Sequence, residues 1–173
     1  MRPTDFSAYA GQEKFLGRGS VIRSLLEDVT KMPSLLVWGP PGCGKTSLAN
    51  ILATSAKASG SVKFVKMSAV TCGVSEVKEV VQTAKTELKM FKRKTILFLD
   101  EVHRFNKTQQ DHFLPHIESG TIIFIGATTE NPSFSLNNAL LSRCKLISLE
   151  KLSATAVYEI IKRALDQENV EIV

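Results

Sequence analysis

The sequence predicts an α/β fold in which helices cover both faces of a five-stranded parallel sheet. Three observations lead to this fold class. Short apolar runs recur along the 173 residues, segments with helical spacing separate most of them, and polar residues follow several runs directly. Strands that are apolar on both faces are typical of a buried parallel sheet. Ligands bind beyond the carboxyl ends of such strands, so we expect the functional residues there.

Five strands are expected, over residues 34–39, 62–68, 95–100, 121–127 and 145–150. Four longer helices are expected, over residues 44–58, 74–91, 106–120 and 153–168, because apolar residues recur there at spacings of three and four. A short helical turn before Arg143 precedes the last strand. A shift in composition near residue 150 predicts a core domain over residues 1–150 and the start of a helical domain over residues 151–173.

Composition is that of a globular chain, with 43% hydrophobic and 23% charged residues. No apolar run is long enough to cross a bilayer, so no membrane association is expected. Three cysteines without a CxxC pair favour a reducing compartment. The net charge of +5 is compatible with a nucleic-acid partner. The basic run KMFKRK, residues 89–94, is interpreted as a solvated helix end, with a DNA-backbone contact or a nuclear-import signal as the alternatives.

The segment GPPGCGKT, residues 39–46, fits the pattern G-x-x-x-x-G-K-[ST] between a predicted strand and a predicted helix. Its glycines let backbone N–H groups face phosphates, Lys45 is expected to reach the β- and γ-phosphates, and Thr46 to bind Mg²⁺. Cys43 is either a tolerated small residue or a thiolate stabilised by the helix N-terminus. The predicted nucleotide-binding residues of this segment are Gly39, Pro40, Pro41, Gly42, Cys43, Gly44, Lys45, Thr46 and Ser47.

Two adjacent carboxylates, Asp100 and Glu101, end the third predicted strand. Placing carboxylates at the rim of a core costs free energy, so we expect them only where a cation compensates their charge or where they have a function. Asp100 is expected to hold Mg²⁺, mainly through water, and Glu101 to accept a proton from an attacking water. Thr128 and Thr129 follow the fourth strand and are able to donate toward a γ-phosphate, although the same residues also suit a turn.

The histidines are expected to serve the fold. His112 and His116 have the i,i+4 spacing of metal ligands, but Pro115 lies between them and no third ligand is near in sequence, which disfavours a zinc site. His103 is expected to be structural, because Asp100 and Glu101 already supply a metal ligand and a base.

An acidic pair after one strand, a polar end to the next and an arginine after a short helix together resemble the AAA+ ATPases. The resemblance implies a three-layer P-loop fold in which the strand with the polar end lies between the other two functional strands. It implies that Thr129, with Thr128 as second choice, senses the γ-phosphate. The stretch RPTDFSAYAGQ, residues 2–12, resembles the adenine-side segment of clamp-loader and junction-motor relatives, implying base contacts by Tyr9, Ala10 and Gly11.

Longer stretches are similar to a narrower family, that of the Werner-helicase-interacting ATPase and bacterial replication-associated recombination protein A. These are WGPPGCGKTSLA, KRKTILFLDEVHRFNKTQQDHFLPHIESGTI and IGATTENPSFSLNNALLSRC. The resemblance implies a DNA-stimulated ATPase that acts at stalled or gapped replication forks, uses ATP and Mg²⁺, and forms homo-oligomers. It implies partners such as a replicative polymerase or a RecQ-type helicase, and a nuclear location, or a cytoplasmic one in a bacterium.

The same resemblance gives Arg143 a role as an arginine finger, which stabilises charge at the nucleotide site of the next subunit. Arg143 is then expected to be exposed in a monomer and satisfied only in a ring or an open arc. The alternative is a surface arginine that covers Leu141. The family's ubiquitin-binding zinc finger has no matching Cys/His cluster here, and only the first helix of its lid is expected, without the lid arginine that senses nucleotide. Two other functions stay open: an interaction module that binds ATP with little turnover, and a clamp-loader-like or junction-motor subunit.

Overall fold

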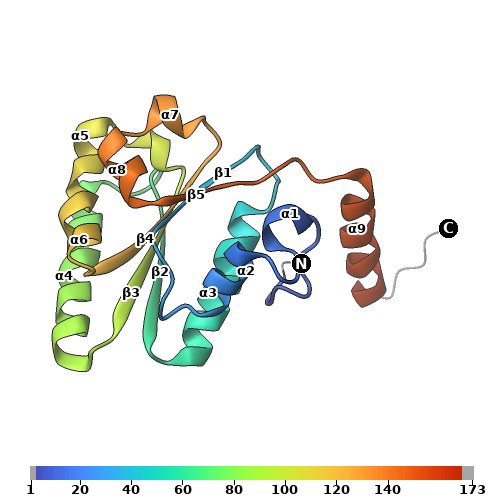
Figure 1. The fold of residues 1–173 in the computed structure, drawn as a ribbon, viewed down its shortest axis with the longest axis horizontal. Coiled ribbons are helices and arrows are strands. Elements are labelled where there is room, and N and C mark those ends of the chain that lie inside the picture. Colours follow the sequence, from blue (N-terminus) through green and yellow to red (C-terminus); the bar gives the residue numbers. More distant parts are fainter. Residues whose placement is uncertain (1–2, 169–173) are drawn as a thin grey trace.

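A computed structural model describes residues 3–168 and confirms the five-stranded parallel sheet (Figure 1). The strand order is β2-β3-β4-β1-β5, with every neighbouring pair parallel. This order places β4 between β1 and β3, as the family resemblance implied. The strands are β1 (Leu35–Trp38), β2 (Val62–Ser68), β3 (Lys94–Asp100), β4 (Ile122–Thr128) and β5 (Lys145–Ser148).

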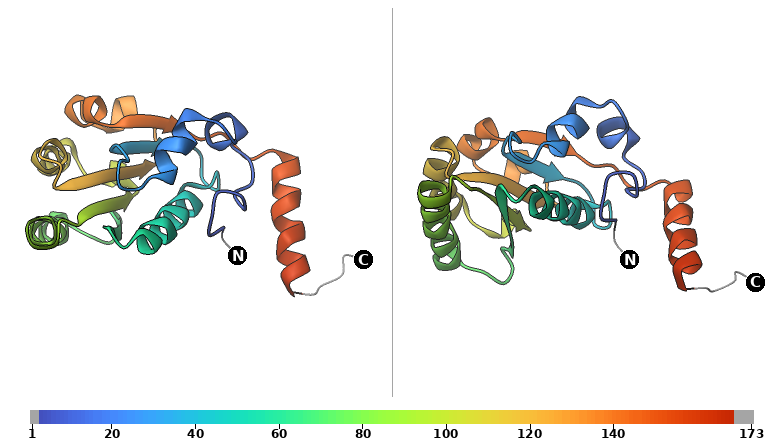
Figure 2. Two further views of the ribbon diagram at one scale, coloured as in Figure 1. Left: turned by 60° about the horizontal axis from the view of Figure 1, so that its bottom comes forward. Right: turned by 90° about the horizontal axis from the view of Figure 1, so that it is seen from below.

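Helices cover both faces of the sheet, so the molecule has three layers (Figure 2). One face carries α1 (Glu13–Leu16), α2 (Val21–Glu27) and α3 (Lys45–Ser59). The other face carries α4 (Val74–Phe91), α5 (Lys107–Gln110), α6 (Leu114–Glu118) and α8 (Asn138–Arg143), with α7 (Pro132–Ser135) beside α8.

Alternate residues of each central strand supply the two halves of the core. Leu35 and Val37 of β1 belong to the cluster under α1, α2 and α3, whereas Leu36 belongs to the cluster under α4 and the shorter helices. On this second face the rings of Phe113 and Phe124 stack with centroids 4.9 Å apart. Burial on both faces explains the continuous apolar runs of the sequence.

The helix predicted over residues 106–120 is broken into three pieces. Residues 107–110 form α5, Asp111–Phe113 form a 3₁₀ turn, and residues 114–118 form α6. Pro115 lies in the first turn of α6, where its missing N–H is harmless, but in mid-helix it would remove a backbone hydrogen bond. The apolar spacing correctly indicated a side that faces the core, because Phe113 is buried. The prediction of one continuous helix was wrong.

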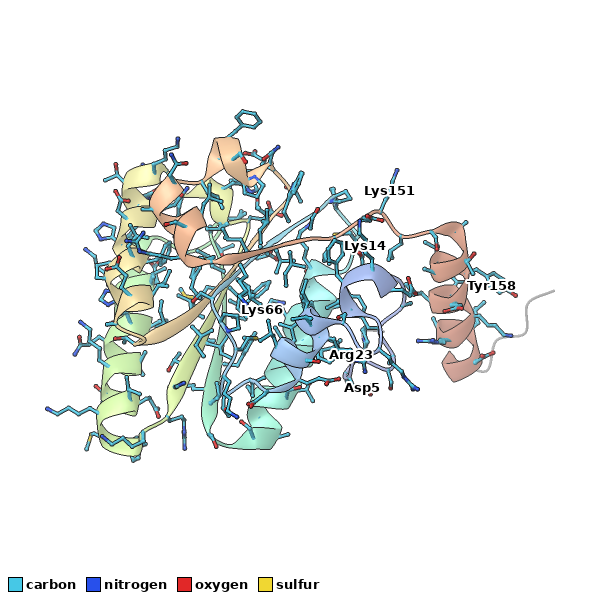
Figure 3. All side chains as sticks on the ribbon, in the orientation of Figure 1. Asp5, Lys14, Arg23, Lys66, Lys151 and Tyr158 are labelled. Carbon is cyan, nitrogen blue, oxygen red and sulfur yellow. The ribbon has the colours of Figure 1, made fainter. Side chains whose placement is uncertain are left out.

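Helix α9 (Ala154–Glu168) stands apart from the sheet at the side of the molecule (Figure 1). It reaches the N-terminal segment through Arg163, whose Nη1 donates to the carbonyl of Ala8 at 2.9 Å. Tyr158 is 59% exposed and lies on the outer side of α9 (Figure 3). Within residues 3–168, no helix combines the length and apolar character needed to cross a bilayer. Residue 2 of the N-terminal motif and residues 169–173 of the predicted second domain lie outside the described part.

Candidate functional site

The carboxyl ends of β1, β3 and β4 meet at a cavity of about 600 Å³. Three separate segments of the sequence supply its walls: the glycine-rich loop with the start of α3, the acidic pair after β3, and the end of β4. The lining residues are Pro41, Gly42, Gly44, Lys45, Thr46, Ser47, Val70, Asp100, Glu101, Arg104 and Thr129. The structure thus brings together most residues that the sequence predicted for phosphate, metal and water.

Lys45 is the first residue of α3 and its side chain is folded back along the loop. Its ammonium donates to the carbonyls of Gly39 at 2.7 Å and Pro40 at 2.9 Å, and the residue is only 7% exposed. No carboxylate of residues 3–168 lies within ion-pair distance of it. A buried cation without an anionic partner is unfavourable, so this arrangement favours an anion in the adjoining cavity. The amides in the first turn of α3 have no helical acceptor and add donors to it.

Behind the loop, the N-terminal segment packs directly on its backbone. The Tyr9 hydroxyl donates to the carbonyl of Gly44 at 3.2 Å, and burial raises the pKa of Tyr9 above its usual value. Gly44 has φ +110°, and a Cβ there would overlap the Tyr9 hydroxyl. The glycine at this position is therefore required both by its backbone conformation and by its neighbour. Cys43 is 1% exposed, which places its thiol in the core and not in the cavity.

The acidic pair lies opposite the loop. The backbone N–H of Glu101 donates to Asp100 Oδ1 at 3.1 Å, and the Thr129 hydroxyl is 3.4 Å from Glu101 Oε2. Glu101 has φ +53°, an uncommon left-handed conformation that is typical of functional sites when a non-glycine residue adopts it. Asp100 and Thr46 present oxygen atoms to the same cavity, and oxygen ligands are those that Mg²⁺ prefers. The residues present therefore fit that ion.

Two residues after the acidic pair were missed as parts of the site. Arg104 lines the cavity and brings a second cation to it. His103 is nearly buried, and its Nε2 lies 3.2 Å from Glu101 Oε2. The motif DEVHRF contained both, but the 3₁₀ turn Val102–Arg104, which places Arg104 at the cavity and His103 against Glu101, is not visible in the apolar pattern.

Arg143 lies outside the cavity, at the end of α8, and the expectation that it is satisfied only in a ring is wrong. Its guanidinium forms an ion pair with Glu118 of α6 and donates to the carbonyl of Ala139 at 2.8 Å. Glu118 is 25 residues away in the sequence and meets Arg143 because α6 and α8 pack side by side. The arginine is nonetheless partly exposed, with 35% of its side-chain surface accessible.

A second, smaller cavity of about 150 Å³ lies where the N-terminal segment meets the chain after β5. Gly11 lines it, whereas Tyr9 lies behind the loop and Ala10 is half-buried between them. Gln12 joins the two segments: its amide donates to the carbonyl of Glu150 at 2.6 Å and accepts from the Glu150 N–H at 2.9 Å. Lys14 of α1 and Lys151 of the chain after β5 also line this cavity, and both side chains are labelled in Figure 3.

The remaining candidates form no site. Among the described residues, no three His, Cys, Asp or Glu side chains gather as a metal site would require. Burial raises the pKa of the Cys144 thiol to about 12, and the pKa of Cys72 is also raised by burial. Both thiols are therefore weak nucleophiles near neutral pH.

Residues 35–151 match the AAA family, described as the ATPase family associated with various cellular activities. The chain belongs to this family. The match covers β1 to β5 with the loop, the acidic pair, the end of β4 and α8. It confirms the P-loop NTPase fold that the sequence motifs implied.

Several relatives of this AAA domain bear the name replication-associated recombination protein A. The chain is 49% identical over 96% of its length to replication-associated recombination protein A of Haemophilus influenzae, and 50% identical over 96% to ATPase WRNIP1 of Dictyostelium discoideum. It spans 36% and 18% of those two proteins. The structure of a Thermotoga maritima RuvB P216G mutant matches the whole chain with a TM-score of 0.79 at 26% identity, the chain covering 57% of that protein. These relatives agree with the narrower family that the motifs indicated.

Proposed function

We propose that this AAA domain binds ATP in the large cavity and hydrolyses it as part of a protein of DNA replication and recombination. One observation carries the proposal. The ammonium of Lys45 is buried, donates to loop carbonyls and has no carboxylate partner among residues 3–168, and it lies beside a cavity whose far wall holds two carboxylates. A triphosphate would supply the missing negative charge. Mg²⁺ and the attacking water, held by those carboxylates, would complete the site.

The phosphates bind to the loop, with the amides around Gly42 and Gly44 and the start of α3 as donors. Lys45 leaves the carbonyls of Gly39 and Pro40 and moves to the β- and γ-phosphates, an exchange of two neutral acceptors for charged ones. Thr46 and Asp100 would hold Mg²⁺, which would neutralise charge on the phosphate oxygens.

Glu101 accepts the proton of the attacking water. Its Oε2 has neighbours in Thr129 and His103, whereas no hydrogen-bond partner of its Oε1 is found among residues 3–168. A base with one anchored oxygen and one free oxygen is suited to orient a water molecule. Thr129 directly follows β4, the central strand of the sheet, and positions both the carboxylate and the γ-phosphate.

The base of the nucleotide lies toward the second cavity, near Tyr9, Ala10 and Gly11. Residues 1–150 form the nucleotide-binding core in this proposal, and α9 is the first helix of a lid over the base. In this proposal, the hydrogen bond from Arg163 to the carbonyl of Ala8 attaches α9 to the N-terminal segment and does not sense nucleotide. The ion pair of Arg163 with Glu159 lies within α9 itself.

The substitution Glu101→Gln tests hydrolysis directly. It keeps the shape of the side chain but removes the base, so phosphate release from ATP should fall by about 10²–10⁴-fold while ATP still binds. Glu79→Gln, on the exposed side of α4, is the matched control and should hydrolyse ATP like the wild type. Normal turnover by Glu101→Gln would show that another residue is the base.

We further propose that DNA is the partner that stimulates this ATPase, through contacts with its phosphate backbone. The names of the relatives and the net charge of +5 support this, and such contacts predict binding that weakens steeply with salt. The second candidate function, an interaction module with little turnover, is favoured by the cis pairing of Arg143 with Glu118. ATP that binds tightly but is not hydrolysed, with or without forked DNA, would favour that module.

A further inference from the structure

His103 lies at the centre of a hydrogen-bonded chain that joins the acidic pair to the end of β4. Its Nε2 is 3.2 Å from Glu101 Oε2, and its Nδ1 is 2.9 Å from the hydroxyl of Thr128. Only 6% of the His103 side chain and none of Thr128 is exposed. A polar group that is buried this far is held by its partners, so the imidazole has a fixed orientation.

The direction of each hydrogen bond follows from the donors present. A carboxylate only accepts, so the nitrogen facing Glu101 carries the hydrogen, and in the neutral ring Nδ1 then accepts from the Thr128 hydroxyl. Thr128 also accepts from the backbone N–H of Glu130 at 3.0 Å. The single hydrogen of its hydroxyl has two acceptors in reach, Nδ1 at 2.9 Å and the carbonyl of Glu130 at 3.3 Å, and Nδ1 is the nearer. A second carboxylate, that of Glu130, lies 3.7 Å from Nε2 but is 60% exposed, so Glu101 is the closer and better-shielded partner.

We propose that His103 is a positioning residue for the general base: it holds one oxygen of Glu101 and ties that carboxylate to the rigid end of β4 through Thr128. The inference rests on the proposed function, in which Glu101 activates water. Thr128 pairs with Trp38 of β1 in the middle of the sheet, so it is a fixed point. Glu101 itself lies in a left-handed turn at the edge of the cavity, and no strand holds its side chain.

The contacts on Glu101 Oε2 leave the other carboxylate oxygen for water. His103 and Thr129 both approach Oε2, at 3.2 and 3.4 Å. Loss of the His103 contact lets the carboxylate rotate among its rotamers, and its free oxygen then faces the water only part of the time. The expected loss lies in kcat and not in nucleotide binding, because no atom of His103 lines the cavity.

Two variants test the contacts of the two imidazole nitrogens separately. His103→Gln places an amide nitrogen near the position of Nε2 and keeps a donor for Glu101, whereas His103→Asn keeps a partner for Thr128 and loses Glu101. His103→Ala removes both. All three are compared in the full chain by thermal melting, by affinity for a fluorescent ATP analogue, and by kcat and KM for ATP with Mg²⁺.

We expect His103→Ala and His103→Asn to lower kcat by about 10²-fold, the usual effect of a misplaced catalytic group, with analogue affinity unchanged. His103→Gln should retain most of the activity. In the Glu101→Gln background, His103→Ala should cause no further loss, because it acts through Glu101.

Three outcomes would overturn the positioning role. They are wild-type kcat in His103→Ala, recovery by His103→Asn but not by His103→Gln, or a faster kcat in His103→Ala, which would mean that the histidine restrains Glu101 unproductively. Failure of the proposed function looks different, because then the wild-type chain itself neither binds the analogue nor releases phosphate.

Discussion

Gly44 is the residue at which the phosphate loop and the N-terminal segment are packed most closely. Its φ of +110° already disfavours other residues, and a Cβ would also overlap the hydroxyl of Tyr9. Gly42 has φ +75° but no atom within 4 Å of its Cβ position. Substitutions at the two glycines therefore distinguish the backbone contribution to the free energy of unfolding from the packing contribution.

We predict that Gly44→Ala lowers the free energy of unfolding by more than Gly42→Ala. The backbone term is about 1–2 kcal/mol in each variant, and the overlap adds about 1–3 kcal/mol at Gly44 alone. Tyr9→Phe in the Gly44→Ala background removes the overlapping hydroxyl and should recover part of the loss. Urea unfolding of the three variants and of Tyr9→Phe measures these terms. Equal losses at the two glycines would contradict the packing of Tyr9 on the loop.

At the scale of elements, the strands and longer helices were predictable because their signal is local. The predicted strand over residues 121–127 is β4, Ile122–Thr128, and the predicted helix over residues 74–91 is α4. The short helices α1, α2 and α7 have too few residues for a periodic signal and depend on tertiary packing. Pro115 was visible in the sequence, but its power to divide the helix over residues 106–120 was underestimated.

The residues of the site also fall into those that local sequence patterns predicted and those that they did not. Residues at strand ends, such as Lys45, Asp100 and Thr129, were predictable from the motifs and from the rule that ligands bind beyond the strands. Contacts between distant segments were not, because local patterns carry no information on them. Gln12 and Glu150 are 138 residues apart, and the partner of Arg143 came from a different helix.

The contact of Gln12 with Glu150 gives a prediction about how elements are joined. Gln12→Ala leaves the N–H and carbonyl of Glu150 without their partner, which should cost about 1–3 kcal/mol of unfolding free energy. The amide of Glu150 should also exchange its hydrogen faster. Gln82→Ala on the exposed face of α4 is the control and should change little. Unchanged exchange at Glu150 in Gln12→Ala would argue against this junction.

At the scale of the whole molecule, Arg143 decides whether one subunit completes the site of another. In the single chain it pairs with Glu118, so a role in trans requires it to exchange that partner for a phosphate. The position of the ion pair at the surface makes the exchange inexpensive, since exposed ion pairs contribute only about 0–1 kcal/mol.

We predict that Arg143→Ala subunits bind ATP normally yet depress hydrolysis by wild-type subunits when the two are mixed. Activity is measured at fixed total concentration over a range of mixing ratios, and should fall below the straight line between the two pure proteins. Glu118→Ala subunits, which lose only the cis partner, should not depress it. A straight line for Arg143→Ala would mean that each subunit works alone.

Binding of a non-hydrolysable ATP analogue with Mg²⁺, measured by calorimetry on wild type and on Lys45→Ala, tests the central claim most directly. We predict one analogue for each wild-type chain and no measurable binding by Lys45→Ala, because the buried ammonium is the principal charge that faces the phosphates. Equal affinity in the two proteins, or no binding by a folded wild-type chain, would contradict the assignment of this cavity to a nucleoside triphosphate.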